Sequence, residues 1–518
     1  MTAAGGRGER NPWLIAIVVS VATFMEVLDT TIANVALPYI AGGMAVSADE
    51  ATWVVTTYLV SNAVALTASS HLAKALGRKR FFLICLALFT GSSILCGLAW
   101  DIRSLLFFRI LQGLGGGGMV PVSQSILADA FPPHKRGQGF ALFGVAVVVA
   151  PVVGPTLGGW LSDNFSWHWC FLINGPIGLL SAALVSIVVE ETPALDGATR
   201  FDIVGFVLVS TFLGSLEVVL DRGQIEDWFS SSFILAFAAV GALAFTLMIP
   251  WEARHESPVV DIRMIATRQF GSCFFVMMAI GAILISTTQM LPQLLQLNFG
   301  YTAMLAGLVL SPGGLVTMGM MFVVGRLSGR VQPKYLIMIG AGVVALSMYN
   351  LTSLYGDLDF WFFARSRIYI GMGLPLIFIP ITAASYNGIP PHKTDQASAL
   401  INVARNIGGS IGVSLAQNVL AHRQQFHMSR LAEATIPSNI AYQDALRRLT
   451  DYFVSLGSSA SVARRQATQW IGRQIETQSA MLAYIDVFYT LMLLAALVIP
   501  LAMILRRIPL GAPAPAAH

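Results

Sequence analysis

Two stretches of this sequence decide its architecture: residues 101–115, DIRSLLFFRILQGLG, and residues 359–373, DFWFFARSRIYIGMG. At an offset of 258 residues the first aspartate, one arginine and two glycines coincide, and PPHK recurs at 132–135 and 390–393. The correspondence continues for five further residues beyond each PPHK. Two adjacent apolar segments are therefore repeated, which indicates two related halves in the same orientation.

The composition around these stretches is that of a membrane protein. Of the 518 residues, 55% are hydrophobic and only 11% are charged, and the mean hydropathy is +0.70. A soluble protein is about 25% charged, so the chain cannot cover a water-soluble surface of its size, which excludes a soluble enzyme and a nucleic-acid-binding protein. The net charge is only +4, and four cysteines without a CxxC pair indicate neither a metal site nor a disulfide framework.

Segments long enough to cross a bilayer follow one another along the chain. A membrane-spanning helix needs about 20 apolar residues, and the runs here are continuous, unlike the alternating pattern of a membrane strand. The sequence predicts an all-α polytopic membrane protein with fourteen spans, at 13–38, 52–72, 81–99, 105–127, 139–161, 170–189, 201–220, 231–250, 270–295, 303–325, 334–355, 361–386, 396–420 and 484–505.

Basic residues predict the orientation of these spans. Eighteen arginines and lysines fall in the short segments on one side, whereas only Arg103 and Arg222 fall in the short loops on the other. This bias predicts that both termini are cytoplasmic. The apolar run after the N-terminal residues is too long for a cleaved signal peptide, so we interpret it as a retained helix.

The repeat and the spans together predict the organisation of the chain. Two six-helix halves flank an inserted helix pair, and the second half includes a large periplasmic loop with two amphipathic helices. The predicted divisions are 1–190 for the first half, 201–250 for the inserted pair, 265–505 for the second half including the loop at 422–483, and 506–518 for a cytoplasmic tail.

Four motifs give the chain a resemblance to a known family. They are LDTTIANVALP at 28–38, RILQGLGGGG at 109–118, APVVGPTLGGWL at 150–161 and WHWCFLINGPIG at 167–178. In these motifs the chain resembles the fourteen-helix drug:proton antiporters of the major facilitator superfamily, in the EmrB/QacA branch. It departs from the family pattern at SHLAKALGRK, residues 70–79, where Lys74 replaces the usual acid, and at His168, where the family has arginine.

The resemblance implies proton-coupled multidrug efflux by alternating access from the bacterial inner membrane. It also implies a tripartite assembly, with hydrophobic small-molecule drugs, protons and the lipid bilayer as partners, together with a periplasmic membrane-fusion adaptor and an outer-membrane channel. The loop at 422–483 would dock the adaptor or simply cap the outer vestibule. A proton-coupled importer or exporter of a specific metabolite is the alternative, and a polytopic membrane enzyme is a remote one. No nucleic acid, metal or cofactor is expected beyond the coupling proton.

Ionisable residues at membrane depth are the strongest candidates for function, because a charge there costs about 2.5–3.5 kcal/mol on insertion scales. Glu26 and Asp29 share a face of the first span. Asp29 is predicted to carry the proton, with a structural helix cap or a helix–helix hydrogen bond as the alternative. Glu26 would share or relay that proton, bind a cationic drug, or extend into water. Arg109 is predicted to be the counter-ion of these acids, and the alternative is that it extends to the outer membrane interface. Glu217 is predicted to pair with Arg222 at a helix end.

Polar and adaptable apolar residues of the spans are candidates for the substrate cavity. Amides also join helices within membranes, so interhelical packing is the alternative for each of them. The predicted substrate-binding residues are Asn34, Tyr58, Asn62, Gln112, Gln289, Gln293, Met372, Phe378, Asn402, Arg405 and Asn406.

The fifth span carries the motif that marks antiporters in the family. Its prolines each remove a backbone donor, and its glycines allow a neighbouring helix to approach closely. The resemblance implies that this helix lies against the opposite half, while ordinary tight packing is the alternative. The motif residues are Pro151, Gly154, Pro155, Gly158 and Gly159.

Overall fold

The computed structural model describes residues 11–132, 135–191, 201–256, 258–356, 358–390 and 393–507. This described part is helical and contains no strand. The N-terminal residues and most of the predicted tail at 506–518 lie outside it, as do parts of both PPHK segments. The first half contains α1 (Pro12–Met44), α2 (Ala48–Leu76), α3 (Arg78–Cys96), α4 (Ile102–Ala130), α5 (Arg136–Asn164), α6 (Trp169–Leu172) and α7 (Asn174–Val188).

The inserted pair and the second half follow in chain order. The pair consists of α8 (Ile203–Arg222) and α9 (Ser232–Arg254), joined through η2 (Trp228–Ser230). The second half begins with the short α10 (Ile262–Ile265) and contains α11 (Arg268–Asn298), α12 (Ala303–Leu327), α13 (Pro333–Leu351), α14 (Phe360–Ser385), α15 (Thr394–Ala432), η4 (Glu433–Thr435), α16 (Ile440–Ser455) and α17 (Ala460–Met503).

The repeated aspartates of the sequence begin corresponding helices. The Asp101 side chain accepts a hydrogen bond from the Ser104 N–H at 2.8 Å and caps α4. The Asp359 side chain accepts one from the Phe362 N–H at 3.0 Å and caps α14. Each carboxylate satisfies a backbone donor that the first helical turn would otherwise leave free. The repeat is therefore structural as well as sequential: the matching aspartates begin matching helices.

Thirteen helices of the described part are long and apolar enough to cross a membrane. They account for every predicted span except 396–420, which forms the first part of α15. That helix carries buried or half-buried polar residues at Ser398, Asn402, Arg405 and Asn406, which lower its hydropathy. It nevertheless packs along α11, α17, α2 and α4, so protein surrounds much of its polar surface.

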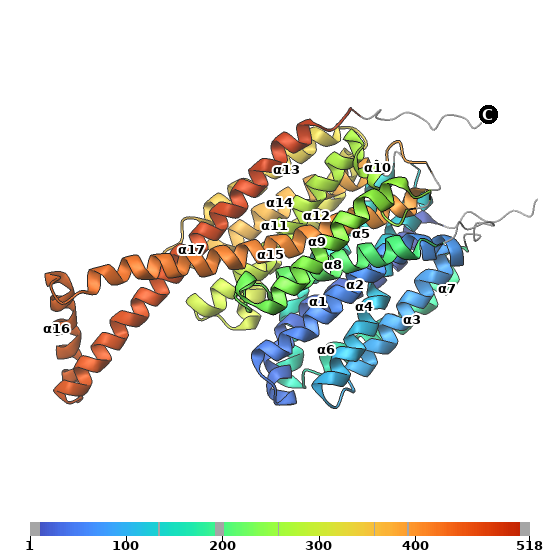
Figure 1. Cartoon of the computed structure of the whole chain (residues 1–518). Coiled ribbons are helices and arrows are strands. Elements are labelled where there is room, and N and C mark those ends of the chain that lie inside the picture. Colours follow the sequence, from blue (N-terminus) through green and yellow to red (C-terminus); the bar gives the residue numbers. More distant parts are fainter. Residues whose placement is uncertain are drawn as a thin grey trace, which may run out of the picture.

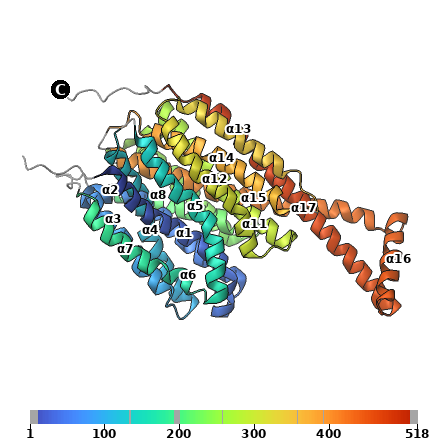
Figure 2. The same cartoon turned by 180° about the vertical axis from the view of Figure 1, so that it is seen from behind.

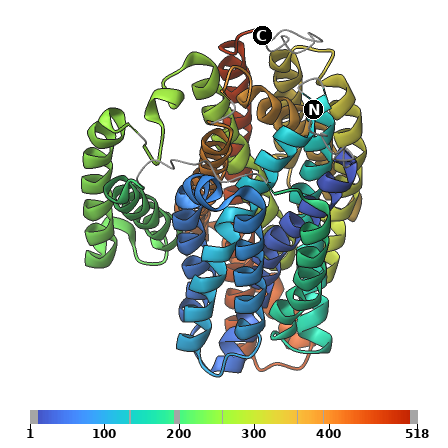
Figure 3. The same cartoon turned by 90° about the vertical axis from the view of Figure 1, so that its right-hand side faces the viewer.

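The two halves lie side by side as separate bundles (Figure 1), with the first half in blue and the second in yellow to red. They meet where α5 packs on α12 and α14, and where α15 packs on α2 and α4. The inserted pair stands on the flank of the bundle (Figure 3), where α8 contacts both α2 and α15. The start of α1 and the end of α17 lie at one end of the bundle, here called the terminal end.

The motif of α5 contacts two different helices. Gly154 and Gly158 face α1 of the same half. A Cβ on Gly154 would lie 2.0 Å from Thr31 Oγ1, and a Cβ on Gly158 would lie 3.2 Å from Ile32. The opposite half contacts α5 mainly through α12, where Gly307 faces Thr156. Gly159 is buried, and Pro151 and Pro155 lie half-buried inside the continuous α5. The motif thus packs α5 on α1, while other residues of α5 form the contact between halves.

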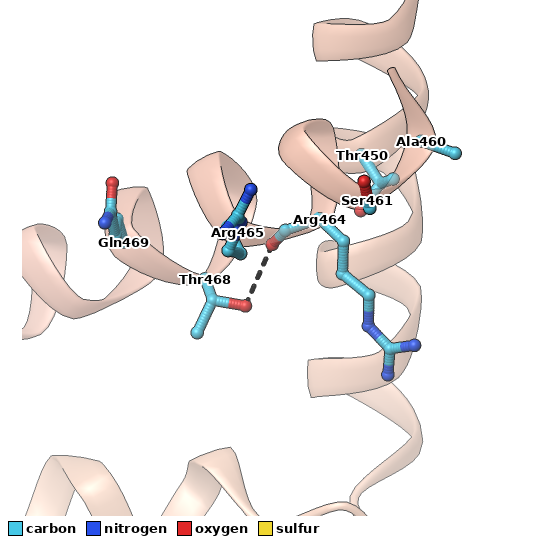
Figure 4. Close-up of a pocket in the computed structure, with 7 residues that line it drawn as sticks. All are labelled: Thr450, Ala460, Ser461, Arg464, Arg465, Thr468 and Gln469. Carbon is cyan, nitrogen blue, oxygen red and sulfur yellow. Dashed lines mark hydrogen bonds between the residues drawn. The ribbon is translucent and has the colours of Figure 1, made fainter. Parts of the chain in front are cut away.

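The segment 422–483 extends helices of the bundle. The end of α15, α16 and the start of α17 project away from the bundle opposite the terminal end (Figures 1 and 2). One of the two expected amphipathic helices is α16, which buries Leu446 against α17; the other is the first part of α17 itself. A hollow between α16 and α17 is shown in Figure 4 and is lined by Thr450, Ala460, Ser461, Arg464, Arg465, Thr468 and Gln469.

Candidate functional site

Asp29 lies at the centre of a buried polar cluster in the first half. Arg109 Nη1 donates to its Oδ2 at 2.7 Å, and neither side chain is exposed. Its Oδ1 accepts from Gln112 Nε2 at 2.9 Å and from Asn174 Nδ2 at 2.7 Å. Donors from α4 and α7 therefore hold a carboxylate of α1. A charge-assisted hydrogen bond of this kind is about twice as strong as a neutral one.

Arg109 is fixed in place by further contacts. Its Nε donates to the Val54 carbonyl at 3.0 Å, and its Nη1 also reaches Gln112 Oε1 at 2.8 Å. The guanidinium lies over the Tyr58 ring, 4.3 Å from the centroid. The side chain is wholly buried, so it does not extend to the membrane interface as a long basic side chain near a helix end often does.

Asn174 is a member of this cluster that sequence reasoning did not single out. Besides Asp29 it donates to Ser93 Oγ at 3.0 Å, and Ser93 donates to the Phe171 carbonyl at 2.9 Å. Asn174 belongs to the WHWCFLINGPIG motif, which was quoted for its resemblance alone. The signal that could have found it is an amide in an otherwise apolar segment of a recognised motif.

Glu26 forms a second site, distinct from that of Asp29. Its Oε1 accepts from Tyr58 OH and from Asn62 Nδ2, both at 3.2 Å. Arg405, on α15 of the opposite half, attracts Glu26 electrostatically, and no direct hydrogen bond joins the two in the part of the chain that the structure describes. Within the described ranges, Arg405 Nη1 is buried without a hydrogen-bond partner. A cation of the second half therefore lies close enough to Glu26 to interact with it electrostatically.

Tyr58 joins the two carboxylate sites. Its hydroxyl group binds Glu26, and its ring carries the guanidinium that neutralises Asp29. As their spacing predicted, Glu26 and Asp29 lie on one face of α1, and Tyr58 connects the side chains around them into a single network. The two acids have different immediate partners, which gives them separate chemical environments.

Other predicted substrate-binding residues lie between helices. Asn402 Nδ2 donates to Gln124 Oε1 at 2.7 Å across the two halves, and Phe378 packs near Gly144 of α5. Gln293 accepts from Gln417 at 3.2 Å, while Asn406 lines a small cavity beside Glu217. Asn34, Gln289 and Met372 are exposed and are not part of the Asp29 or Glu26 network.

The terminal end carries an ion network between the halves. Arg78 of α3 donates through Nε to Asp395 Oδ1 at 2.8 Å and through Nη2 to Asp395 Oδ2 at 3.2 Å. It also pairs with Asp129 at the end of α4. Nearby, Ser398 donates to the Pro121 carbonyl at 2.7 Å. These contacts fasten the two halves together at this end, although Lys74 replaces the acid usual in this loop.

The expected pair of Glu217 with Arg222 is wrong. Arg222 instead reaches Glu226 at 3.4 Å and the Asp49 carbonyl at 3.1 Å. Glu217 binds Ser410 of α15. The reason is the helical spacing: the two residues are five apart, so they lie on different faces of α8.

Two parallel helical bundles with an acid and an arginine buried at membrane depth define a membrane transporter. The family model of the Major Facilitator Superfamily matches residues 19–413. The chain belongs to that family.

Individual relatives agree with this assignment. The chain is 34% identical to the multidrug export protein EmrB of Escherichia coli K12 over 482 residues, 92% of both chains. It is 34% identical to the fatty acid resistance protein FarB of Neisseria gonorrhoeae over 471 residues, 89% of this chain and 91% of that one. A double tryptophan mutant of XylE has the same fold, with a TM-score of 0.61 and 13% identity over 97% of both chains. The chain is thus a multi-pass transport protein of the bacterial inner membrane.

Proposed function

We propose that the protein exports hydrophobic drugs in exchange for protons, and that Asp29 is the coupling acid. The observation that carries the proposal is the Asp29–Arg109 pair, which is fully buried and hydrogen-bonded on both carboxylate oxygens. A proton and the Arg109 guanidinium compete for the negative charge of the Asp29 carboxylate. Protonation therefore releases the arginine, and deprotonation recaptures it, which gives the two states that exchange requires.

Glu26 is the proposed contact for a cationic drug. It lies at membrane depth, faces Arg405 across the two halves and shares Tyr58 with the Asp29 cluster. A bound cation would take the place of Arg405 as the partner of Glu26. Because Tyr58 contacts both Glu26 and Arg109, occupancy at one site alters the packing at the other. The names of the EmrB relatives support multidrug export as the overall activity.

Alternating access assigns a role to the ion network at the terminal end. With this end in the cytoplasm, as the distribution of basic residues predicts, the contacts of Arg78 with Asp395 and Asp129 close the cytoplasmic side. Opening toward the cytoplasm then requires Arg78 to leave Asp395, since the two lie on different halves. The closed end and the buried Asp29 pair belong to one state of this cycle.

The test is proton flux through purified protein in proteoliposomes with a pH-sensitive dye inside. Adding drug should drive protons in the direction opposite to the drug, and Asp29→Asn should reduce this flux to background while drug binding persists. The matched control is Asp163→Asn, which alters an exposed acid of α5. Flux of drug and protons in the same direction would support the importer instead, and wild-type exchange by Asp29→Asn would remove Asp29 from the mechanism.

The projecting segment is the proposed docking site of a periplasmic adaptor that leads to an outer-membrane channel. It is outside the bundle and carries seven arginines between residues 422 and 483. Replacing residues 430–475 with a flexible linker should spare exchange in proteoliposomes and abolish resistance in cells that contain the adaptor. Full resistance in those cells would place docking elsewhere, and loss of exchange would assign the segment to the transport cycle.

A further inference from the structure

The inserted helix α8 carries two acids that the Asp29 mechanism does not use. Glu217 is 8% exposed and Asp221 is half-buried, and they lie four residues apart on one face of the helix. No Lys, Arg or His within the described residues forms an ion pair with either acid at 4.0 Å or less. Among these residues, Glu217 has no cation near it, and Asp221 has only the adjacent Arg222, which attracts it without forming an ion pair, so the stability of the two neighbouring acids requires another explanation.

Each acid contacts a hydroxyl group on a different half of the transporter. Both carboxylate oxygens of Glu217 lie within hydrogen-bond distance of Ser410 Oγ on α15, at 2.8 and 2.9 Å. One oxygen of Asp221 binds Thr56 Oγ1 on α2. The helices α2 and α15 belong to opposite halves, so α8 bridges the halves through two acid–hydroxyl contacts away from the terminal end.

The number of protons available at each hydroxyl group favours the protonated form of the acids. A hydroxyl group has one proton to donate, yet Ser410 Oγ faces both the Glu217 carboxyl group and the Asn406 carbonyl, 3.2 Å away. Thr56 Oγ1 likewise faces both Asp221 and the Thr52 carbonyl, also 3.2 Å away. A protonated carboxyl group resolves both cases, because it donates to the hydroxyl oxygen and leaves the hydroxyl proton for the backbone carbonyl.

The surroundings of Glu217 offer little stabilisation for a negative charge. It borders a cavity of about 10 Å³ whose wall is otherwise apolar except for Asn406, room for about one water. Sequence residues 53–70 of α2 and 232–251 of α9 contain no charged side chain. Arg222 on α8 is engaged by Glu226 and the start of α2, and Arg405 on α15 faces Glu26.

We infer that Glu217 and Asp221 form a second proton-binding site, which fastens the two halves together through Ser410 and Thr56 when both acids are protonated. Loss of the protons leaves two like charges on one face of α8 and one hydroxyl proton for two acceptors at each contact. The contacts then weaken, and α8 separates from α15 or from α2. The inserted pair therefore acts as a proton-dependent clasp, an activity beyond the exchange proposed for Asp29.

Infrared difference spectra of the full-length protein in lipid vesicles test the protonation directly. As the pH is raised, the wild type should lose carbonyl-stretching bands of protonated carboxyl groups. Glu217→Gln should remove one such band and Asp221→Asn a second. Unchanged bands in Glu217→Gln would overturn the inference. The spectra need neither drug nor gradient, so they remain decisive if Asp29 is not the coupling acid.

Amide hydrogen exchange of α8 tests the clasp itself. After correction for the intrinsic effect of pH, exchange in wild-type α8 should accelerate as the acids lose their protons, and Glu217→Gln should reduce that acceleration. The matched control is Glu252→Gln in α9, because this buried acid accepts from the Val260 N–H at 3.2 Å and contacts neither Ser410 nor Thr56. The control should behave as wild type. Equal acceleration in Glu217→Gln and wild type would overturn the clasp.

A second variant, which retains Glu217, keeps the inference testable if Glu217→Gln fails to fold. Ser410→Ala removes the hydroxyl group that faces Glu217 and leaves the carboxyl group in place. The Glu217 band should therefore move to higher frequency, as expected when a carboxyl group loses its hydrogen-bond partner. A band that stays at its wild-type position would show that Ser410 does not hold a protonated Glu217.

Discussion

Arg109 and Arg367 occupy matching positions in the two halves, yet among the residues that the structure describes only Arg109 has a carboxylate partner. Arg109 is bound by Asp29, Gln112 and the Val54 carbonyl. Arg367 is 5% exposed, and its Nε and Nη1 are buried with no hydrogen-bond partner. An unpaired buried cation is costly. Both halves of the repeat thus contain the arginine, but only the first half contains the carboxylate that neutralises it.

The largest effect should come from removing the paired arginine. Arg109→Gln leaves Asp29 buried without its cation, which should cost about 3–5 kcal/mol of stability. It also removes the group that Asp29 is proposed to exchange for a proton, so drug-driven proton flux should fall to background. Arg367→Gln removes a charge that has no partner and should raise the melting temperature while retaining most transport. Drug-driven proton flux and thermal unfolding of both variants measure the contrast. Equal loss of transport in both would give the two arginines equivalent roles.

An intermediate effect is expected at Glu26, the acid that faces the second half. Glu26→Gln keeps the contacts with Tyr58 and Asn62 but removes the charge. Affinity for cationic drugs should fall by about 10-fold, the loss of one hydrogen bond to a charged group, and affinity for neutral drugs should change little. Equilibrium binding to a panel of both charge classes measures this. An equal fall for both classes would make Glu26 structural or part of the proton relay.

The smallest effect concerns the helix caps that the halves share. The Ser104 backbone N–H and hydroxyl group lower the pKa of Asp101. Its contribution to stability is therefore present above the ordinary carboxyl pKa and is lost as the pH falls through the lowered value. Asp101→Ala and Asp359→Ala should each lower the melting temperature by about 1–2 °C at neutral pH. Thermal unfolding checks this, and the Asp101→Ala difference should vanish in strong acid.

Arg109 and Arg367 also illustrate which features of the structure could be predicted from the sequence alone. Composition and the repeat were sufficient for the helical architecture, because span length and helix starts depend on local residues. Asp29 and Arg109 were predictable as a pair, since few charges lie at membrane depth and the motifs named both. The isolation of Arg367 was not, because it depends on which side chains the neighbouring helices place beside α14.

The contacts that join distant segments were also beyond the sequence. Arg78 and Asp395 are 317 residues apart, and nothing in either local pattern indicates the other. Glu217 was assigned to a nearby arginine, whereas its partner is a serine on α15, a residue type too common to attract notice. The glycines of α5 were recognised as packing positions, but only the fold shows that they face α1.

The length of α17 has a mechanical consequence. Its 44 residues form one continuous helix, about 66 Å long and twice the thickness of the hydrocarbon layer. One rod therefore runs from the end of the bundle to the tip of the projecting segment. If its membrane part tilts by about 5° while the rod stays straight, the far end moves by about 6 Å. A small movement of the buried helices therefore becomes a larger displacement at the tip, where it would act on any protein bound there.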